Sequence, residues 1–125
     1  MTQFIKTEHA PAAIGPYSQA VLAGNTLYVS GQIPFVPETM KVAGDDVASQ
    51  TRQSLQNVKG IVEAAGFKVA DIVKCTVFLK DMNDFAAMNA EYAAFFGDHK
   101  PARAAVEVAR LPRDVKVEID AICVR

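Results

Sequence analysis

The chain has 125 residues, of which 50% are apolar and 22% charged, and its formal net charge is −1. A chain of this length has the size of one domain, so we expect a single domain over residues 1–125 with a core that needs no disulfides. Lysine and arginine are spread along the sequence. This argues against a nucleic-acid or membrane-surface partner, because both require a basic face.

The first residues, MTQFIKTEHAPAA, lack the basic start and the apolar stretch of a signal peptide. No apolar window of the sequence has the length needed to span a bilayer. We therefore expect a cytoplasmic protein.

The first third of the sequence predicts short strands and turns. Residues 3–7 are a strand candidate, and a loop rich in proline and glycine follows. Residues 20–34 have the pattern of a hairpin, with a two-residue Gly-Asn turn between apolar runs. Ser30-Gly31 ends the second strand of this hairpin, and a loop with two prolines comes next.

Two amphipathic helices are predicted from apolar residues at helical spacing. The first begins after Gly44, with an aspartate as its cap, and stops at Gly66. The second lies within residues 82–97 and stops at Gly97. The expected apolar stripes are Val47, Thr51, Leu55, Val58, Val62 and Ala65 in the first helix, and Phe85, Met88, Tyr92 and Phe95 in the second.

The remaining segments are strand candidates at residues 71–81, 102–111 and 115–124. The element order is then β-β-β-α-β-α-β-β, an α+β domain in which the helices connect the later strands. In the strand at 71–81, alternate residues from Val73 to Leu79 form one apolar face. Ile72 and Phe78 make its other face partly apolar.

Two helices can cover only one face of a sheet of five or six strands. Because the strand at 71–81 is apolar on both faces, the uncovered face also requires burial. We infer an oligomer in which sheet faces pack against one another.

The cysteines and histidines indicate structural roles. Cys75 and Cys123 lie in apolar runs and are expected to be buried, reduced thiols. His9 and His99 are far apart and have no further ligand at suitable spacing. The sequence therefore predicts neither a metal site nor a Ser-His-Asp system, and it has no glycine-rich phosphate loop.

Arg103 stands among alanines and valines in a predicted strand, where a guanidinium needs a partner. Alternation places it on the same face as Ala105 and Glu107. One interpretation is structural, either an ion pair with Glu107 or a bridge to another subunit. The other is that Arg103 binds an anionic ligand through two contacts.

Several other polar residues are site candidates, each with a structural alternative. Glu118 and Asp120 share the polar face of the last strand, which either faces solvent or holds a water molecule in a cleft between subunits. Asn89 lies four residues after Phe85 and points partly toward the apolar stripe of its helix. A core polar network and a ligand contact are equally compatible with that position.

The loop residues Tyr17 and Ser18 and the strand end at Ser30-Gly31 are positions where a backbone or side chain can face a ligand. None of them identifies a site alone. The residues by themselves predict an oligomeric α+β domain with an unexplained arginine.

Five separated motifs resemble, in order and spacing, the Rid (YjgF) family of reactive intermediate deaminases, and among these the RidA branch. They are IGPYSQAV, YVSGQIP, QTRQSLQNVKGIVEAAG, DIVKCTVFLKDMNDFAAMNAEYAAFF and PARAAVEVARLPRDVKVEIDAICV. The resemblance covers nearly the whole chain. It implies a chorismate-mutase-like fold assembled as a homotrimer, with clefts between the subunits.

The resemblance also implies an activity, the hydrolytic deamination of enamine and imine intermediates without a cofactor. Its substrates would be 2-aminoacrylate and 2-aminocrotonate, or their imines 2-iminopropanoate and 2-iminobutanoate. These are released by pyridoxal-phosphate-dependent dehydratases, and the products are 2-oxo acids and ammonia. The alternative is a non-catalytic protein that binds 2-oxo acids or related metabolites in a regulatory role.

Carried over to this sequence, the resemblance makes Arg103 the carboxylate-binding residue and Glu118 the acid that orients water. The backbones of Gly31 and Ala105 would contribute to substrate binding. The side chains that would shape the cleft are Tyr17, Ser30 and Asn89. Ala104-Ala105 replace the Ser or Thr and the Cys that follow the arginine in many relatives, so a thiol role at this position is absent.

Overall fold

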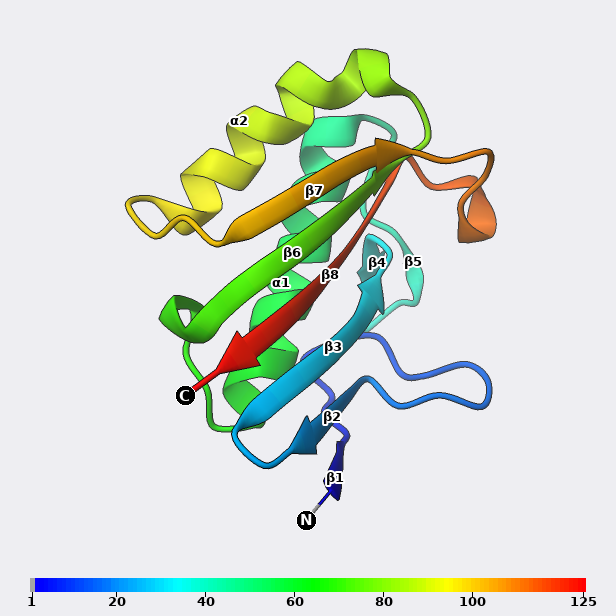
Figure 1. The fold of residues 1–125 in the computed structure, drawn as a ribbon. Helices are drawn as coiled ribbons and strands as arrows, with labels where there is room; N and C mark the ends of the chain where they lie inside the picture. The colour runs from blue at the N-terminus through cyan, green and yellow to red at the C-terminus, as the bar shows by residue number, and fades with distance from the viewer. Residues whose placement is uncertain (1) are drawn as a thin grey trace.

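The structure is a computed structural model that describes residues 2–125. Its main sheet has six strands in the order β1-β2-β3-β8-β6-β7, and both helices cover the same face of it (Figure 1). The strands are β1 (Thr2–Ile5), β2 (Ala20–Ala23), β3 (Thr26–Gln32), β4 (Phe35–Val36), β5 (Lys41–Val42), β6 (Ile72–Leu79), β7 (Ala102–Glu107) and β8 (Val117–Val124), and the helices are α1 (Val47–Ala64) and α2 (Phe85–Phe96).

The predicted α+β class is confirmed. Strands β6 and β7 are parallel and joined by α2, while all other neighbours in the main sheet pair antiparallel. The predicted order omitted the β4–β5 hairpin, a separate two-stranded sheet. Its strands have two residues each, which is too short for alternating hydrophobicity to identify them.

Both helices occupy the predicted segments. Asp46 is the N-cap of α1, and the helix ends before Gly66, whose φ of 84° suits a residue without a side chain. In α2 the core-facing positions are Met88, Tyr92 and Phe96. The stripe is wider than predicted, because Phe96 is buried as well, while the predicted Phe85 and Phe95 are half-buried and pack against the core.

The core lies between the helices and one face of the sheet. Strand β8 follows its predicted alternation, with Val117, Ile119, Ala121 and Cys123 all buried. In β6 the prediction for Val73 was wrong. A register shift between Ile72 and Lys74 buries Ile72 and leaves Val73 exposed, so the alternation of the strand is interrupted there.

The opposite face of the sheet carries exposed apolar side chains, as the sequence indicated. Phe4 is 72% exposed, Tyr28 51% and Val106 42%. These residues come from β1, β3 and β7, so apolar surface extends from one edge of the sheet to the other. We call this surface the open face.

Both cysteines are free and buried, as predicted. Burial raises the pKa of Cys75 to about 11 and that of Cys123 to about 12. Both thiols therefore stay protonated at neutral pH and pack as small apolar groups. In the part of the chain that the structure describes, neither helix has the length and hydrophobicity needed to cross a bilayer.

Candidate functional site

Arg103 lies on the edge strand β7 and faces α2. It is paired in register with the buried Cys75 of β6, so its side chain is on the helix side of the sheet. Its Nη1 donates a hydrogen bond of 2.7 Å to Oδ1 of Asn89. The guanidinium carbon lies 4.8 Å from the ring centroid of Tyr92 and 5.4 Å from that of Phe85.

The ion pair between Arg103 and Glu107, one of the structural alternatives, is not formed. Glu107 instead accepts a hydrogen bond from the backbone N–H of Met82 at 2.8 Å. Within residues 2–125, the ion pairs of arginines with carboxylates join Arg52 to Glu91 and Arg110 to Asp114. The positive charge of Arg103 therefore has no carboxylate partner among the described residues.

Glu118 lies on β8 and points to the open face, because it pairs with Phe78 of β6 and both alternate with buried neighbours. Burial raises the pKa of Glu118, and the nearby charge of Asp120 raises it further. Asp120 is occupied, since its Oδ1 accepts a hydrogen bond from the Thr76 N–H at 2.9 Å. Of the two acids on this face, Glu118 is the one whose carboxylate is available.

A β-bulge in β3 lies beside Glu118. Val29 pairs with Ala121 and Gln32 with Ile119, so Ser30 and Gly31 together face a single residue of β8. A Cβ at Gly31 would overlap the Glu118 carboxylate and lie 2.9 Å from its Cδ. A side chain at this position would force the Glu118 carboxylate to move, because the acid occupies that space.

The loop before β2 closes over this bulge. Ser30 Oγ donates a hydrogen bond of 2.6 Å to the carbonyl of Ser18. Tyr17 Oη accepts one of 3.4 Å from the N–H of Ile14. Tyr17 and Gly31 line the same small cavity of about 40 Å³. We call Tyr17, Ser30, Gly31 and Glu118 the bulge group.

The other predicted residues form a second group on α2 and β7. Ala105 follows Arg103 on the same face and is half-buried against the core. We call Arg103, Asn89 and Ala105 the arginine group. Sequence reasoning placed Phe85 and Tyr92 only in the core stripe. Their spacing of four and three residues around Asn89 is the signal that links them to the arginine.

The two groups lie on opposite faces of the sheet within one chain. Arg103 is in register with Cys75 and Ala121, which face the helices, whereas Glu118 is in register with Phe78 on the open face. One chain therefore brings the seven predicted residues together as two groups of four and three, and not as a single site.

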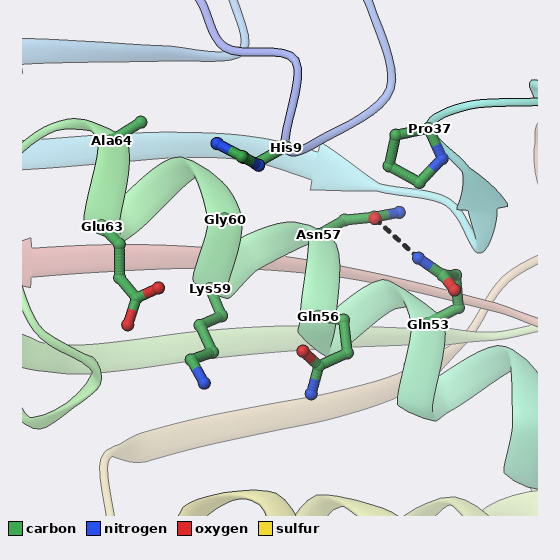
Figure 2. A pocket seen from close by; sticks show the side chains of 9 residues that line it. All are labelled: His9, Pro37, Gln53, Gln56, Asn57, Lys59, Gly60, Glu63 and Ala64. Atoms are coloured by element: carbon green, nitrogen blue, oxygen red, sulfur yellow. Dashed lines mark hydrogen bonds between the residues drawn. The ribbon is translucent and has the colours of Figure 1, made fainter.

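The structure also has two larger hollows. One of about 540 Å³ runs along α1 and contains none of the predicted residues (Figure 2). It is bounded by the loop at His9, whose carbonyl occupies the space that a Cβ of Gly60 would need. The other, of about 1250 Å³, lies between β1 and the loop that carries Tyr17 and Ser18. Only this second hollow adjoins the bulge group.

We expect Gly31→Ala to lower any activity that depends on Glu118 by at least about tenfold, because the added methyl displaces the carboxylate and misplaced groups lose orders of magnitude in rate. The measurement is kcat/KM beside the melting temperature. Gly97→Ala is the matched control, since Gly97 has a φ of 61° and a Cβ added there would meet no atom within 4 Å. That control should lose more than about 1 kcal/mol of stability, because alanine is strained at this backbone conformation, and keep its activity. Equal activity in the two variants would contradict the role of Gly31.

Comparison with known proteins gives consistent matches over the whole chain. Residues 7–125 match the Endoribonuclease L-PSP family. The chain is 64% identical to the 2-iminobutanoate/2-iminopropanoate deaminase of Escherichia coli K12 over 128 aligned positions, covering 100% of this chain and 99% of the relative. The crystal structure of the YjgF gene product of E. coli superposes with a TM-score of 0.95 at 64% identity, covering 98% of each chain. E. coli TdcF with bound serine also has a TM-score of 0.95, at 53% identity and the same coverage.

Proposed function

Because the chain belongs to the Endoribonuclease L-PSP (YjgF) family, we propose that it is a hydrolase acting on carbon–nitrogen bonds, an enamine/imine deaminase. Its substrates are 2-iminopropanoate and 2-iminobutanoate, formed from 2-aminoacrylate and 2-aminocrotonate, and its products are 2-oxo acids and ammonia. The family membership rests on the match over residues 7–125. The substrates follow from the similarity to the E. coli deaminase.

The observation that carries this proposal is an arginine without a carboxylate partner, and an available acid on the other face of the sheet supports it. Arg103 has no carboxylate partner in the described chain and can accept one from the substrate in a two-point, charge-assisted contact. Glu118 has a raised pKa and no competing polar contact such as that of Asp120. A raised pKa brings a carboxyl group closer to the range in which it exchanges protons at neutral pH.

The reaction replaces the C2=N bond of the imine with C2=O. Water attacks C2 of the protonated imine and gives one proton to the Glu118 carboxylate, so that C2 carries a hydroxyl and an amine. Glu118 returns this proton to the amine nitrogen. The C2–N bond then breaks with its electron pair on nitrogen, the departing ammonia takes the hydroxyl proton, and a 2-oxo acid and ammonium leave. Arg103 holds the carboxylate throughout, so the water and C2 stay aligned.

The bulge group shapes the water side of this site. The N–H groups of Gly31 and Ala105 donate to the substrate, while Tyr17, Ser30 and Asn89 form its walls. None of these steps needs a cofactor or a metal ion. The protein acts in the cytoplasm on imines supplied by pyridoxal-phosphate-dependent dehydratases, with neither nucleic acid nor membrane as partner.

The complete site is formed between copies of the chain in a homotrimer. The support is geometric, because the arginine group projects from the edge strand β7 while the bulge group lies on the open face. Exposed Phe4, Tyr28 and Val106 on that face favour burial against another copy. A neighbour packed there would place its Arg103 beside the Glu118 of the first chain.

Mixing two inactive variants tests this arrangement. Arg103→Ala and Glu118→Gln are each expected to be inactive alone, and co-refolding them at equal amounts should restore about a quarter of the wild-type activity, since a quarter of random interfaces join two intact residues. The measurement is turnover of the mixture before and after subunit exchange. No recovery, with exchange verified by mass spectrometry, would mean that both residues act within one chain or at different sites.

A competition assay tests the activity itself. A threonine dehydratase generates the imine in place, and semicarbazide traps whatever remains. The protein is expected to suppress semicarbazone formation and to accelerate release of 2-oxobutanoate and ammonia. Unchanged trapping, together with measurable binding of 2-oxobutanoate, would instead support the non-catalytic alternative.

A further inference from the structure

The guanidinium of Arg103 is held by three side chains of one helix. Phe85, Asn89 and Tyr92 follow each other at intervals of four and three residues, so they form one stripe of α2 facing β7. Asn89 accepts a hydrogen bond from Nη1 at 2.7 Å. The two rings lie 5.4 and 4.8 Å from the guanidinium carbon, within the range of about 6 Å at which an aromatic face attracts a cation.

We propose that Phe85 and Tyr92 form an aromatic shelf that holds the guanidinium of Arg103 in the orientation that binds the substrate carboxylate. Both are positioning residues, which act through Arg103 and not on the reacting atoms. This inference rests on the proposed function, because it takes the ligand of Arg103 to be the carboxylate of a 2-imino or 2-oxo acid.

The contacts of Arg103 restrain it without neutralising it. An amide oxygen and two aromatic faces are attractive to a cation, yet none of them carries a net charge. A carboxylate at any of these positions would cancel the charge that the substrate needs. One of the five guanidinium N–H groups is engaged with Asn89, and the others remain for a two-point contact with a carboxylate.

The shelf also explains how an arginine on an exposed edge strand can be ordered before the ligand arrives. A free arginine side chain populates many rotamers, and restricting them on binding lowers affinity. Tyr92 is itself fixed, being 7% exposed and packed at 4.8 Å against the ring of Phe96. A rigid ring beneath the guanidinium therefore removes part of this cost in advance.

The ring of Tyr92, and not its hydroxyl, makes the contact. Its Oη is buried and forms no hydrogen bond with any described residue. Burial raises the pKa of Tyr92, and the adjacent Cys75 raises it further, so the phenol is neutral and cannot form an ion pair with Arg103. The hydroxyl should therefore be dispensable for binding, whereas the ring should not.

The test compares Tyr92→Leu with Phe67→Leu, which removes a core ring that is 3% exposed and lies beneath Arg125, not Arg103. Tyr92→Leu is expected to weaken 2-oxobutanoate binding and to raise KM by about 3- to 30-fold, with a smaller change in kcat. Phe67→Leu should lose similar stability and keep the binding constant within about twofold, and Tyr92→Phe should restore binding. Equal losses of affinity in Tyr92→Leu and Phe67→Leu would overturn the shelf.

A second series applies if the leucine variants do not fold. Fluorinated phenylalanines at position 92 keep the shape of the ring while withdrawing electron density from its face. Binding of 2-oxobutanoate, measured by calorimetry, should weaken stepwise with fluorination, and the same series at position 67, whose ring lies beneath Arg125, should have no effect. A flat response at position 92 would overturn the proposal.

Two further comparisons separate the shelf from the deaminase activity. In an Arg103→Ala background the substitution at Tyr92 should cause no additional loss of binding, and additive losses would show that it does not act through the arginine. A wild-type protein that binds 2-oxobutanoate through Arg103 without turnover would refute the activity and leave the shelf intact. If the wild-type protein turns over the imine and the variants at position 92 bind 2-oxobutanoate as tightly as the wild type, only the shelf is refuted. No binding that depends on Arg103 would refute both.

Discussion

Replacing Arg103 with alanine is expected to lower kcat/KM for 2-iminobutanoate by about 10²- to 10⁴-fold, because it removes a two-point contact in which each charge-assisted hydrogen bond contributes about 1.5–3 kcal/mol. The loss should appear both in turnover and in the binding of 2-oxobutanoate. Arg103→Lys should recover only part of the affinity, since an ammonium lacks the planar fork that matches a carboxylate.

Arg110→Ala is the matched control for this variant. Arg110 is also an exposed arginine, and it is paired at 2.8 Å with Asp114 in the β7–β8 connection. Its removal should change stability by at most about 1 kcal/mol and leave kcat/KM unaltered. A wild-type kcat/KM in Arg103→Ala would place the carboxylate site elsewhere on the molecule.

Glu118→Gln is expected to lower kcat by about 10²- to 10⁴-fold, the usual contribution of a general acid–base. Glutamine keeps the shape and can still hydrogen-bond a water molecule, but it cannot carry the proton. Binding of 2-oxobutanoate should stay close to that of the wild type, because Arg103 is intact. Full turnover in Glu118→Gln would reduce the residue to a positioning role.

The pH dependence follows from the raised pKa of Glu118. The carboxylate must be unprotonated to accept a proton from water, so activity falls as the pH drops through this pKa. The acidic limb of kcat/KM should therefore lie at a higher pH than for an ordinary glutamate. Asp120→Asn removes a neighbouring like charge and should shift the limb to lower pH, whereas a limb that Asp120→Asn leaves in place belongs to another group.

The ionised form of Glu118, which the proposed reaction needs, lowers the stability of the folded chain. Because its pKa is higher in the folded chain than in the unfolded chain, the folded state binds the proton more tightly. This contribution to stability is present at low pH and decreases as the pH rises through the two pKa values. At neutral pH the ionised Glu118 is unfavourable, and Glu118→Gln should raise the melting temperature while it abolishes turnover.

Local sequence signals were enough for the helices and for most strand faces. An apolar stripe and a terminal glycine mark α1, and both are patterns of residues close in the chain; Asp46 takes the predicted N-cap position, although its side chain forms no capping hydrogen bond. Strict alternation likewise determines which side of β8 is buried, because successive side chains of a strand point to opposite faces. The choice of Arg103 and Glu118 as candidates needed only their charge in apolar strands and the motifs around them.

Irregularities within strands were decided by the tertiary structure. The bulge at Val73 reverses the expected faces of Ile72 and Val73, and the bulge at Ser30-Gly31 opens the backbone beside Glu118. Each depends on the register of a partner strand that is distant in sequence. No local pattern specifies such a register, because one extra residue inverts every later side chain.

The placement of the arginine group and the bulge group on opposite faces of the sheet also depends on the tertiary structure. The alternation within a strand predicts which residues share a face with Arg103 or with Glu118. It does not predict whether that face is the helix side or the open face of the sheet. The parallel pairing of β6 with β7, imposed by the α2 connection, sends Arg103 toward the helices, and the antiparallel pairing of β6 with β8 sends Glu118 to the open face. The sequence by itself determined which residues are candidates for the chemistry, and the pairing of distant strands decided that one chain keeps them apart.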